Sequence, residues 1–380
     1  MKKLSPSRLT DERFMRVCLR QARRVVGLTT PNPAVGCLIV RRGRIIAEGV
    51  TERGGRPHAE AVALQRAGNA ARGATAYVSF EPCAHQGQTP PCARALAQAG
   101  VARVVVGCLD PYPPVRGRGV AALRAAGVEV CLGVLAQECR RLNEGFLSRV
   151  LRGRPFVTLK LAMSADGRIA TASGDSRWIS SAPARRLVHR MRREHDAVMV
   201  GAGTVAKDNP RLTCRIAGGR DPVRVIIDER VALAPWSRIF RLRSDAGAIL
   251  VTTRRRLSAA RKRYGSPMVE VIGLPSVNGR VALSDLMRQL AGRGWCKVLI
   301  EGGAHLAARA LSEEIVDRVC LFVAPILLGC GLSAVEGLEV LRVKAALRLA
   351  NFRARRVGSD WLLEGEPVYR ARSRPKLTAH

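Results

Sequence analysis

Residues 81–92 read EPCAHQGQTPPC and place two cysteines, Cys83 and Cys92, each directly after a proline. Upstream, the segment PHAE supplies His58 and Glu60. Imidazole and thiolate are ligands that zinc prefers, and a catalytic zinc site keeps three protein ligands and one open position for water. Bound zinc brings the pKa of that water to about 7. The sequence therefore predicts that His58, Cys83 and Cys92 bind one zinc ion and that Glu60 moves protons beside it.

The order of these residues matches the H-x-E and P-C signature of zinc-dependent nucleobase deaminases, in which the glutamate is the general acid/base and not a ligand. The match departs in one respect, because eight residues separate the cysteines instead of two. The H-x-E spacing also differs from the H-E-x-x-H of metalloproteases. Two alternatives stay open. The cysteines are buried thiols, or His85 completes a structural zinc site as a fourth ligand.

Alternating periodic segments surround these residues in the first half of the chain. Such alternation favours the α/β class, with a mostly parallel sheet covered on both faces. Cys83 then follows a strand, and His58 and Cys92 begin helices, at the carboxyl edge where such proteins place their sites. The expected elements are helices over 11–27, 57–68 and 92–100, a hairpin over 35–50, and strands over 74–80 and 101–110.

The pattern changes near residue 150, where a basic segment with glycine and proline interrupts the periodicity. We therefore expect two domains, at 1–150 and 151–367, and a basic tail at 368–380. In the second domain, Gly302 and Gly303 separate a strand from a helix and would expose backbone N–H groups that can bind a pyrophosphate. An ordinary glycine-rich turn between the strand and the helix explains these glycines equally. Strands are expected at 156–164, 196–203, 223–228, 248–253, 297–303 and 318–328, and helices at 182–194, 284–293 and 304–312.

The charge is strongly positive. The 380 residues include 64 Lys and Arg against 30 Asp and Glu, a net charge of +34, and only eight of the basic residues are Lys. A nucleic-acid partner, as for an RNA-editing deaminase, is one interpretation. However, the arginines are scattered along the chain and aromatic residues make up 4%, so no stacking platform accompanies them. A generally arginine-rich surface is favoured, and no nucleic-acid partner is expected.

The cysteines and the apolar runs indicate the compartment. Eleven cysteines are an odd number, and most lie in apolar runs, as Cys37 and Cys320 do, which is typical of free thiols in a reducing compartment. The N-terminus lacks the apolar segment of a secretory signal. The most hydrophobic run, 319–335, is interrupted by Pro325 and glycines. We expect a cytoplasmic enzyme with no membrane partner.

Longer motifs carry a resemblance over residues 10 to 365. With TTPNPAVGCLIV, PHAEAVAL, EPCAHQGQTPPC, LKLAMSADGRIATASGDSRWIS, GAGTVAKDNPRLTCR and LIEGGAHLA, the chain closely resembles the bifunctional riboflavin-biosynthesis deaminase/reductase family. The resemblance implies a cytidine-deaminase-like α/β/α N-terminal domain and a dihydrofolate-reductase-like C-terminal domain. It implies zinc-dependent deamination of a phosphorylated diaminopyrimidinone, then NADPH-dependent reduction of its ribosyl group to a ribityl chain. Family members tend to form homo-oligomers.

The resemblance also implies site residues. Asn32 and Asp110 should contact the pyrimidine in the deaminase domain, and Lys160 should protonate or polarise the ribosyl oxygen in the reductase domain. Reductase substrate contacts are implied for Ser176, Arg192, Leu212, Arg215 and Glu301. NADPH contacts are implied for Ala162, Trp178, Thr204, Asp208, Gly303, Ala304, His305, Leu306, Ala307, Ala308 and Arg309.

Two positions depart from the family pattern beside the deaminase pocket. A Lys or Arg that usually helps hold the substrate phosphate is Gln88 here, and an Asn is Tyr112. These changes put substrate affinity in doubt, and a nearby arginine such as Arg116 is expected to substitute. A further hypothesis is that the deaminase half has lost its activity and only reduction survives, although His58 and Glu60 are retained.

Overall fold

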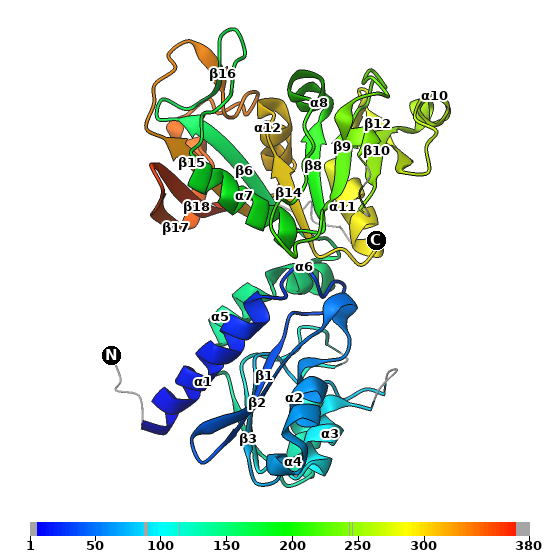
Figure 1. Cartoon of the computed structure of the whole chain (residues 1–380). Coiled ribbons are helices and arrows are strands. Elements are labelled where there is room, and N and C mark those ends of the chain that lie inside the picture. The colour runs from blue at the N-terminus through cyan, green and yellow to red at the C-terminus, as the bar shows by residue number, and fades with distance from the viewer. Residues whose placement is uncertain (1–5, 87–89, 114, 243, 245, 370–380) are drawn as a thin grey trace, which may run out of the picture. The chain divides into compact units, whose positions relative to one another are not determined.

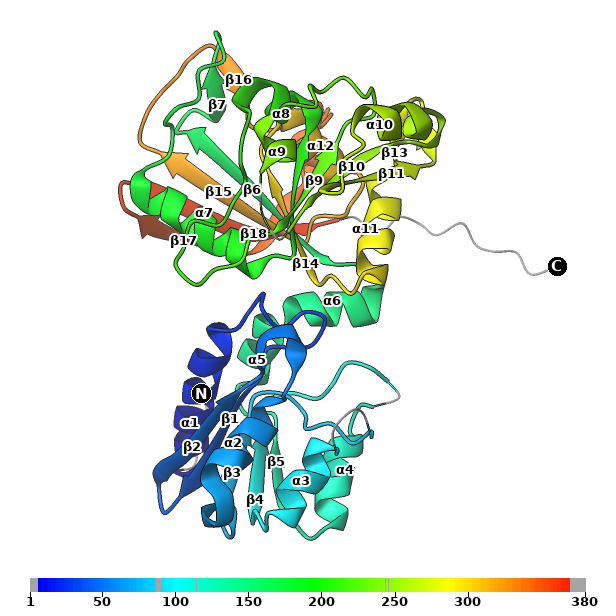
Figure 2. The ribbon, with the colours of Figure 1, turned by 45° about the vertical axis from the view of Figure 1, so that its right-hand side comes forward.

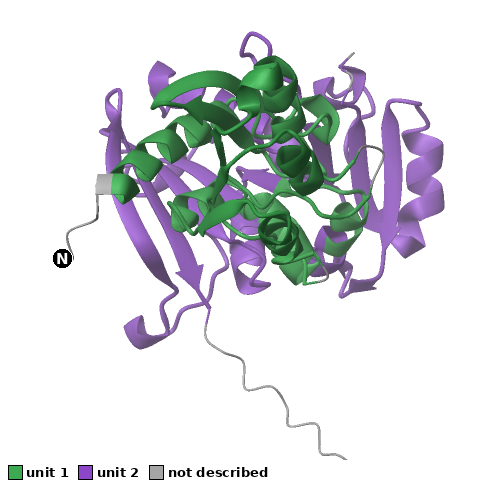
Figure 3. Ribbon diagram, turned by 90° about the horizontal axis from the view of Figure 1, so that it is seen from below, with its two compact units in different colours: residues 1–156, 288–297 green, residues 157–287, 298–380 purple. Residues whose placement is uncertain are grey.

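The computed structural model describes residues 6–86, 90–113, 115–242, 244 and 246–369. The chain, traced in Figure 1, forms two compact units. Unit 1 comprises residues 1–156 together with 288–297, and unit 2 comprises 157–287 and 298–380, as Figure 3 colours them. Helix α11 and strand β14 therefore each contribute residues to both units. Gln88 and the tail from 370 lie outside the described residues.

Unit 1 is built on a sheet with the strand order β2-β1-β3-β4-β5. Strand β1 runs antiparallel to both β2 and β3, whereas β3, β4 and β5 are parallel. The sheet is therefore mixed, because the expected hairpin supplies its antiparallel edge. The strands are β1 Gly36–Arg41, β2 Arg44–Val50, β3 Thr75–Val78, β4 Arg103–Val106 and β5 Glu129–Leu132.

Helices pack against this sheet and against one another (Figure 2). They are α1 Pro6–Arg23, α2 Ala59–Ala67, α3 Cys92–Gln98, α4 Arg118–Ala125, α5 Ala136–Leu142 and α6 Glu144–Arg152, with short 3-10 turns at Arg53–Gly55 and Gly68–Ala71. The approach of α2 to β2 is close. A Cβ atom on Gly49 would lie 2.1 Å from the carbonyl oxygen of Ala59, so only glycine fits there. The first helix starts and ends earlier than the expected 11–27.

Unit 2 contains a larger sheet with the order β11-β10-β9-β8-β14-β6-β15-β18-β17. The pairs β10–β11, β9–β10, β8–β9, β8–β14 and β6–β15 are parallel, and β18 runs antiparallel to β15 and β17. The α/β class is confirmed. The strands are β6 Phe156–Ser164, β8 Ala197–Gly201, β9 Val223–Ile227, β10 Ala248–Thr253, β11 Val269–Leu274, β14 Lys297–Glu301, β15 Arg318–Ala324, β17 Arg348–Val357 and β18 Asp360–Val368, with short pairs β7 Arg168–Thr171 with β16 Gly331–Ser333, and β12 Ser276–Val277 with β13 Arg280–Val281.

The helices of unit 2 include α7, whose start the sequence specifies clearly. Ser181 accepts a hydrogen bond from the backbone N–H of Ala184, and Pro183 occupies the first turn. The helices are α7 Ala182–Glu194, α8 Ala202–Asp208, α9 Arg238–Arg241, α10 Leu257–Arg263, α11 Leu283–Gly292 and α12 Ala304–Ser312, with 3-10 turns at Arg254–Arg256 and Val343–Ala345.

Some expectations for unit 2 need correction. The strand expected over 196–203 ends at Gly201, because α8 begins at the next residue. The strand expected over 318–328 ends at Ala324, just before Pro325, which cannot donate to a ladder. The β17–β18 hairpin was not expected at all, since its first strand is almost wholly exposed and carries no apolar alternation.

Candidate functional site

Three side chains converge in unit 1 from the ends of three elements. His58 precedes α2, Cys83 follows β3, and Cys92 is the first residue of α3. The Nδ1 atom of His58 lies 3.4 Å from Sγ of Cys92 and 3.7 Å from Sγ of Cys83. All three ligand atoms lie within 4.8 Å of one another. Among the described residues this is the one cluster of three or more potential metal ligands, and His85 is not part of it.

The geometry fits a tetrahedral zinc ion. Zn–S bonds of about 2.3 Å and Zn–N bonds of about 2.05 Å at tetrahedral angles place the nitrogen and sulfur atoms about 3.6 Å apart. The two observed separations are 3.4 Å and 3.7 Å. With three protein ligands and no fourth among the described residues, the coordination would keep an open position, which is the arrangement of a catalytic site.

The two thiols differ in their readiness to ionise. Hydrogen bonding from the Cys92 side chain, and then from His58, lowers the pKa of Cys83 to about 4. The backbone N–H of Cys92 also donates to Cys83 Sγ at 3.3 Å. The adjacent Cys83 sulfur in turn raises the pKa of Cys92. Zinc binds cysteines as thiolates, so a bound divalent cation would replace the thiol protons at this site.

Glu60 lies two residues beyond His58 in the first turn of α2 and is buried. Its burial raises the pKa of the carboxyl to about 7, although the nearby His58 opposes the shift. A carboxyl group with a pKa near neutrality can both accept and return a proton, as a general acid/base must. It is not a member of the ligand cluster.

A cavity of about 600 Å³ in unit 1 is lined in part by Ala84 and His85, which follow Cys83 in the chain. The lining includes Asp110, a residue expected to contact the pyrimidine, and the exposed Tyr112. Burial raises the pKa of Asp110, while the backbone N–H of Tyr112 lowers it by donating to the carboxylate at 2.8 Å. The lining residues are Ala84, His85, Asp110, Tyr112, Val115, Arg118, Phe146, Arg149 and Val150.

Asn32 is not among the residues that line this cavity. Its side-chain amide donates to the carbonyl oxygen of Gly55 at 3.0 Å. The loop that carries it is held by the buried Asn143, whose side chain accepts from the N–H of Ala34 at 2.8 Å and donates to its carbonyl at 3.1 Å. Asn32 is therefore held in place by its own contacts and those of its loop.

Glu81 is a functional candidate that the sequence analysis missed. Its buried carboxylate accepts four backbone N–H groups, those of Asp110 and Gly117 on one oxygen and those of Gly119 and Val120 on the other, at 2.9 to 3.3 Å. It thereby joins the segment that leads to Cys83, the loop of Asp110 and the start of α4. The sequence offered one signal for this role. Glu81 stands just before a Pro-Cys pair, and a helix start flanked by glycines follows later in the chain.

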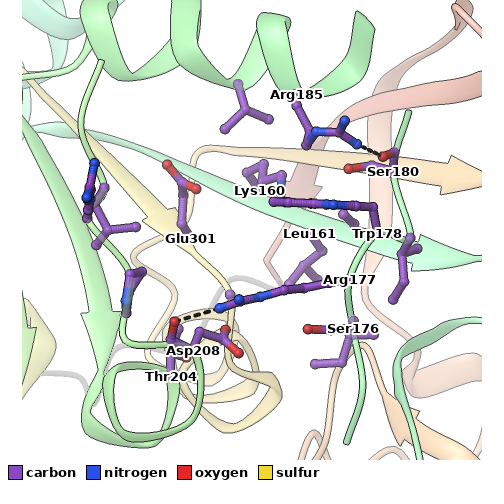
Figure 4. Close-up of a pocket in the computed structure, with 18 of the residues that line it drawn as sticks. Lys160, Leu161, Ser176, Arg177, Trp178, Ser180, Arg185, Thr204, Asp208 and Glu301 are labelled. Carbon is purple, nitrogen blue, oxygen red and sulfur yellow. Dashed lines mark hydrogen bonds between the residues drawn. The ribbon is translucent and has the colours of Figure 1, made fainter. Parts of the chain in front are cut away.

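Unit 2 contains a pocket of about 550 Å³ that most of the expected reductase residues line (Figure 4). They come from β6, α7, α8, β14 and the segments after β7 and α8. The expected residues in the lining are Lys160, Ala162, Ser176, Trp178, Arg192, Thr204, Asp208, Leu212, Arg215, Glu301 and Gly303.

The polar centre of this pocket is an ion pair between Arg192 and Glu301. The guanidinium donates to both carboxylate oxygens, at 2.6 and 2.8 Å, and both side chains are largely buried. Burial alone would raise the pKa of Glu301, but Arg192 and Lys160 outweigh it and lower the pKa. Burial lowers the pKa of Lys160, with Glu301 acting in the opposite direction. The pocket therefore holds a lysine that can release its proton more easily than a surface lysine.

Only the start of the segment that begins at Gly303 lines the pocket. Gly302 and Gly303 line the pocket, but the following residues of α12 do not. His305 is exposed, with its side chain 84% accessible. Arg309 pairs with Glu229 at 2.7 Å and Glu313 at 2.9 Å. The remaining residues, Ala304, Leu306, Ala307 and Ala308, are buried in the helix.

Other residues that the sequence analysis did not name also line this pocket. The Nδ1 atom of His189 lies 3.1 Å from the carbonyl oxygen of Thr213, so Nδ1 carries the proton and Nε2 is left as an acceptor. The guanidinium of Arg185 lies 4.5 Å from the ring centroid of Trp178, whose side chain it covers (Figure 4). Helical spacing relates Arg185, His189 and Arg192 on α7, and this was the signal that could have found them.

None of the helices in the described residues combines the length and the apolar character that crossing a bilayer requires.

Comparisons with known proteins match both parts of the chain. Residues 8–108 match the model of the cytidine and deoxycytidylate deaminase zinc-binding region, and residues 155–363 match that of the RibD C-terminal domain. The chain is 38% identical to riboflavin biosynthesis protein RibD of Aquifex aeolicus over 93% of this chain and 97% of that protein. It is 40% identical to the RibD of Escherichia coli over 88% and 93%.

Solved structures give the same result for the fold. Acinetobacter baumannii RibD superposes with a TM-score of 0.85 at 36% identity, over 95% of this chain and all of that chain. A diaminohydroxyphosphoribosylaminopyrimidine deaminase/5-amino-6-(5-phosphoribosylamino)uracil reductase from Thermotoga maritima has a TM-score of 0.85 at 38% identity, with the same coverage.

Proposed function

Because the chain belongs to the RibD family of bifunctional riboflavin-biosynthesis deaminase/reductases, we propose that it catalyses two successive steps on one phosphorylated pyrimidine. Unit 1 deaminates 2,5-diamino-6-(5-phosphoribosylamino)pyrimidin-4(3H)-one. Unit 2 then reduces the ribosyl group with NADPH, giving 5-amino-6-(5-phosphoribitylamino)uracil. The observation that carries the proposal is the spacing of His58, Cys83 and Cys92 beside the buried Glu60, in the same chain as the Lys160 pocket.

In the deaminase step, His58, Cys83 and Cys92 would hold the zinc, which acidifies water and polarises it for attack. Glu60 takes a proton from the attacking water and passes it to the leaving nitrogen, so that ammonia departs and oxygen remains on the ring. The environment of Glu60 suits this exchange, because burial raises the pKa of the carboxyl to about 7.

Asp110 and Asn32 orient the pyrimidine during this step. Asp110 lines the cavity of unit 1; its backbone N–H donates to Glu81 at 3.0 Å, and its carboxylate accepts from the N–H of Tyr112 at 2.8 Å. Asn32 is restrained through Gly55, which keeps its side chain from turning to other partners. Fixed donors and acceptors of this kind bring the reacting carbon to the nucleophile without further ordering cost.

In the reductase step, NADPH bound in this pocket would supply hydride to C1′ of the ribosyl group, and the bond from C1′ to the ring oxygen would break, so that this oxygen requires a proton. Lys160 donates a proton to that oxygen, because burial lowers the pKa of its ammonium group and makes the proton easier to transfer. Arg192 is held by Glu301 and, with Arg215, faces the substrate phosphate. Trp178, Thr204, Asp208 and Ala162 contact NADPH; these residues line the same pocket, as do Ser176 and Leu212 on the substrate side.

Product mass spectrometry tests both steps on the zinc-loaded protein. Without NADPH, the diaminopyrimidinone ribosyl phosphate should exchange one amino group for oxygen, and adding NADPH should then add two hydrogens. Glu60→Gln should abolish the first change while a synthetic deaminated intermediate is still reduced. Lys160→Met should do the reverse. Absence of deamination by the zinc-loaded wild-type protein would overturn the deaminase proposal.

We also propose a cytoplasmic location and a homo-oligomeric state. All eleven cysteines are free thiols, which suits a reducing compartment that also supplies NADPH. Cell fractionation and light scattering test these two points. A membrane-bound or extracellular pool would contradict the first, and a monomer at all measured concentrations the second.

A further inference from the structure

The cavity of unit 1 carries charges of both signs. Asp110 contributes a carboxylate, and Arg118 and Arg149 are the arginines in the lining. The cavity lining includes Ala84, which directly follows the zinc-cluster residue Cys83, so the cavity adjoins the segment that carries this ligand. A substrate with a neutral ring at one end and a dianionic group at the other would match such a lining.

We propose that Arg118 and Arg149 form the subsite that binds the phosphate of the deaminase substrate. The inference rests on the proposed deaminase function and adds the residues that decide between a phosphorylated substrate and its dephosphorylated counterpart. Guanidinium groups suit this role because their N–H donors match the geometry of phosphate oxygens.

Arg118 is held in position through the backbone. It is the first residue of α4, and the N–H groups on either side of it, those of Gly117 and Gly119, donate to Glu81 at 3.0 and 2.9 Å. Its side chain is exposed, and within the described ranges it forms no ion pair. The α4 terminus is thus fixed by one buried carboxylate while the arginine side chain stays available to a ligand.

Arg149 approaches from α6. One of its terminal nitrogens, Nη2, donates to the carbonyl oxygen of Pro31 at 3.1 Å, and its guanidinium carbon lies 5.7 Å from the ring centroid of Phe146. An arginine has five N–H donors, so this single bond leaves others for a phosphate. No carboxylate of the described residues pairs with it, and its positive charge is not neutralised by the protein.

Arg116 provides a matched control. It is an exposed arginine two residues before Arg118 in the same segment, and it does not line the cavity. The sequence alone offered it as the substitute cation, and the cavity lining favours Arg118 instead. Replacing Arg116 removes the same charge from nearly the same place without removing a group that faces the cavity.

The test compares deamination of the ribosyl phosphate substrate with deamination of the same compound after removal of its phosphate. For Arg118→Ala and Arg149→Ala, we expect kcat/KM for the phosphorylated substrate to fall by about 10- to 100-fold, as for the loss of charge-assisted hydrogen bonds. The dephosphorylated compound should change by less than about threefold, since it never used these contacts. Arg116→Ala should behave as wild type with both compounds.

The second activity of the chain reports on folding. Reduction of the synthetic deaminated intermediate should be unchanged in each variant, because the reductase pocket lies in unit 2. Arg118→Lys and Arg149→Lys keep a positive charge and should recover part of the loss. Competition by ribose 5-phosphate in the deaminase assay should weaken in the alanine variants only.

The outcomes separate this inference from the proposed function. If the wild-type protein does not deaminate either compound, the proposed function fails. If it deaminates the phosphorylated substrate preferentially and both alanine variants keep that preference, the subsite is wrong and the deaminase stands. An equal loss for both compounds, without rescue by lysine, would also overturn the subsite, because it indicates a general structural role.

Discussion

Replacing Glu81 by glutamine tests whether one buried carboxylate holds the deaminase cavity in shape. The carboxylate accepts four N–H groups, two on each oxygen, at 2.9 to 3.3 Å. A glutamine has one carbonyl oxygen that can still accept two of them. Its NH₂ group would face the other two N–H groups, so two buried donors lose their acceptor.

The expected cost follows from these two donors. A buried polar group left without a partner costs about 1–3 kcal/mol, so Glu81→Gln should lower the free energy of unfolding of unit 1 by about 2–6 kcal/mol. This is a large share of the 5–15 kcal/mol that typical domains have. The loop of Asp110 and the start of α4 should loosen first, because they supply the donors.

The assay combines urea denaturation with both activities. Glu81→Gln should lower the midpoint of the transition assigned to unit 1 and raise KM for deamination more than it lowers kcat, since Glu60 is not displaced directly. The reductase activity should be unchanged. Glu81→Asp should recover part of the stability because it retains the charge. Glu138→Gln, at an exposed carboxylate on α5, is the control. Wild-type stability and deaminase KM in Glu81→Gln would refute the reasoning.

Three further predictions concern the zinc ligands and the reductase pocket. Cys83→Ala should reduce the zinc content, measured by atomic absorption after dialysis, from about one per chain to near zero without affecting reduction; full zinc content would contradict the ligand assignment. The reductase kcat should decrease at alkaline pH with a midpoint below 10.5, the ordinary pKa of lysine, because burial lowers the pKa of Lys160 and its proton is lost as the pH rises. If Lys160→Arg leaves this midpoint unchanged, the decrease belongs to another group. Glu301→Gln leaves the buried Arg192 without its charged partner, so thermal denaturation should show unit 2 destabilised by about 3–5 kcal/mol, and wild-type stability would count against the ion pair.

Some features of the fold could be predicted because they depend on nearby residues. Helix α7 begins after Ser181 because that side chain caps it, and it covers the expected 182–194. Helix α3 begins at Cys92 as expected. Strand β17 could not be predicted, because its residues are mostly polar and exposed, and only its pairing with β18 makes it a strand.

The same distinction applies to the division of the chain. A composition change near residue 150 is visible in the sequence. That residues 288–297, far along the chain, join unit 1 is not visible. Their packing depends on contacts with distant residues, such as the ion pair of Lys297 with Glu144 at 3.0 Å.

The sequence by itself determined which residues gather at the candidate zinc site, because residue type and position at the ends of elements were enough to select His58, Cys83 and Cys92, with Glu60 near His58. Only the tertiary structure decided what surrounds them. Glu81 accepts N–H groups up to 39 residues away along the chain, which no local pattern reveals. Arg118 and the nearby Arg116 are chemically equivalent in the sequence. Arg118 is the first residue of α4 and lines the cavity, whereas Arg116 lies in the turn before the helix and does not.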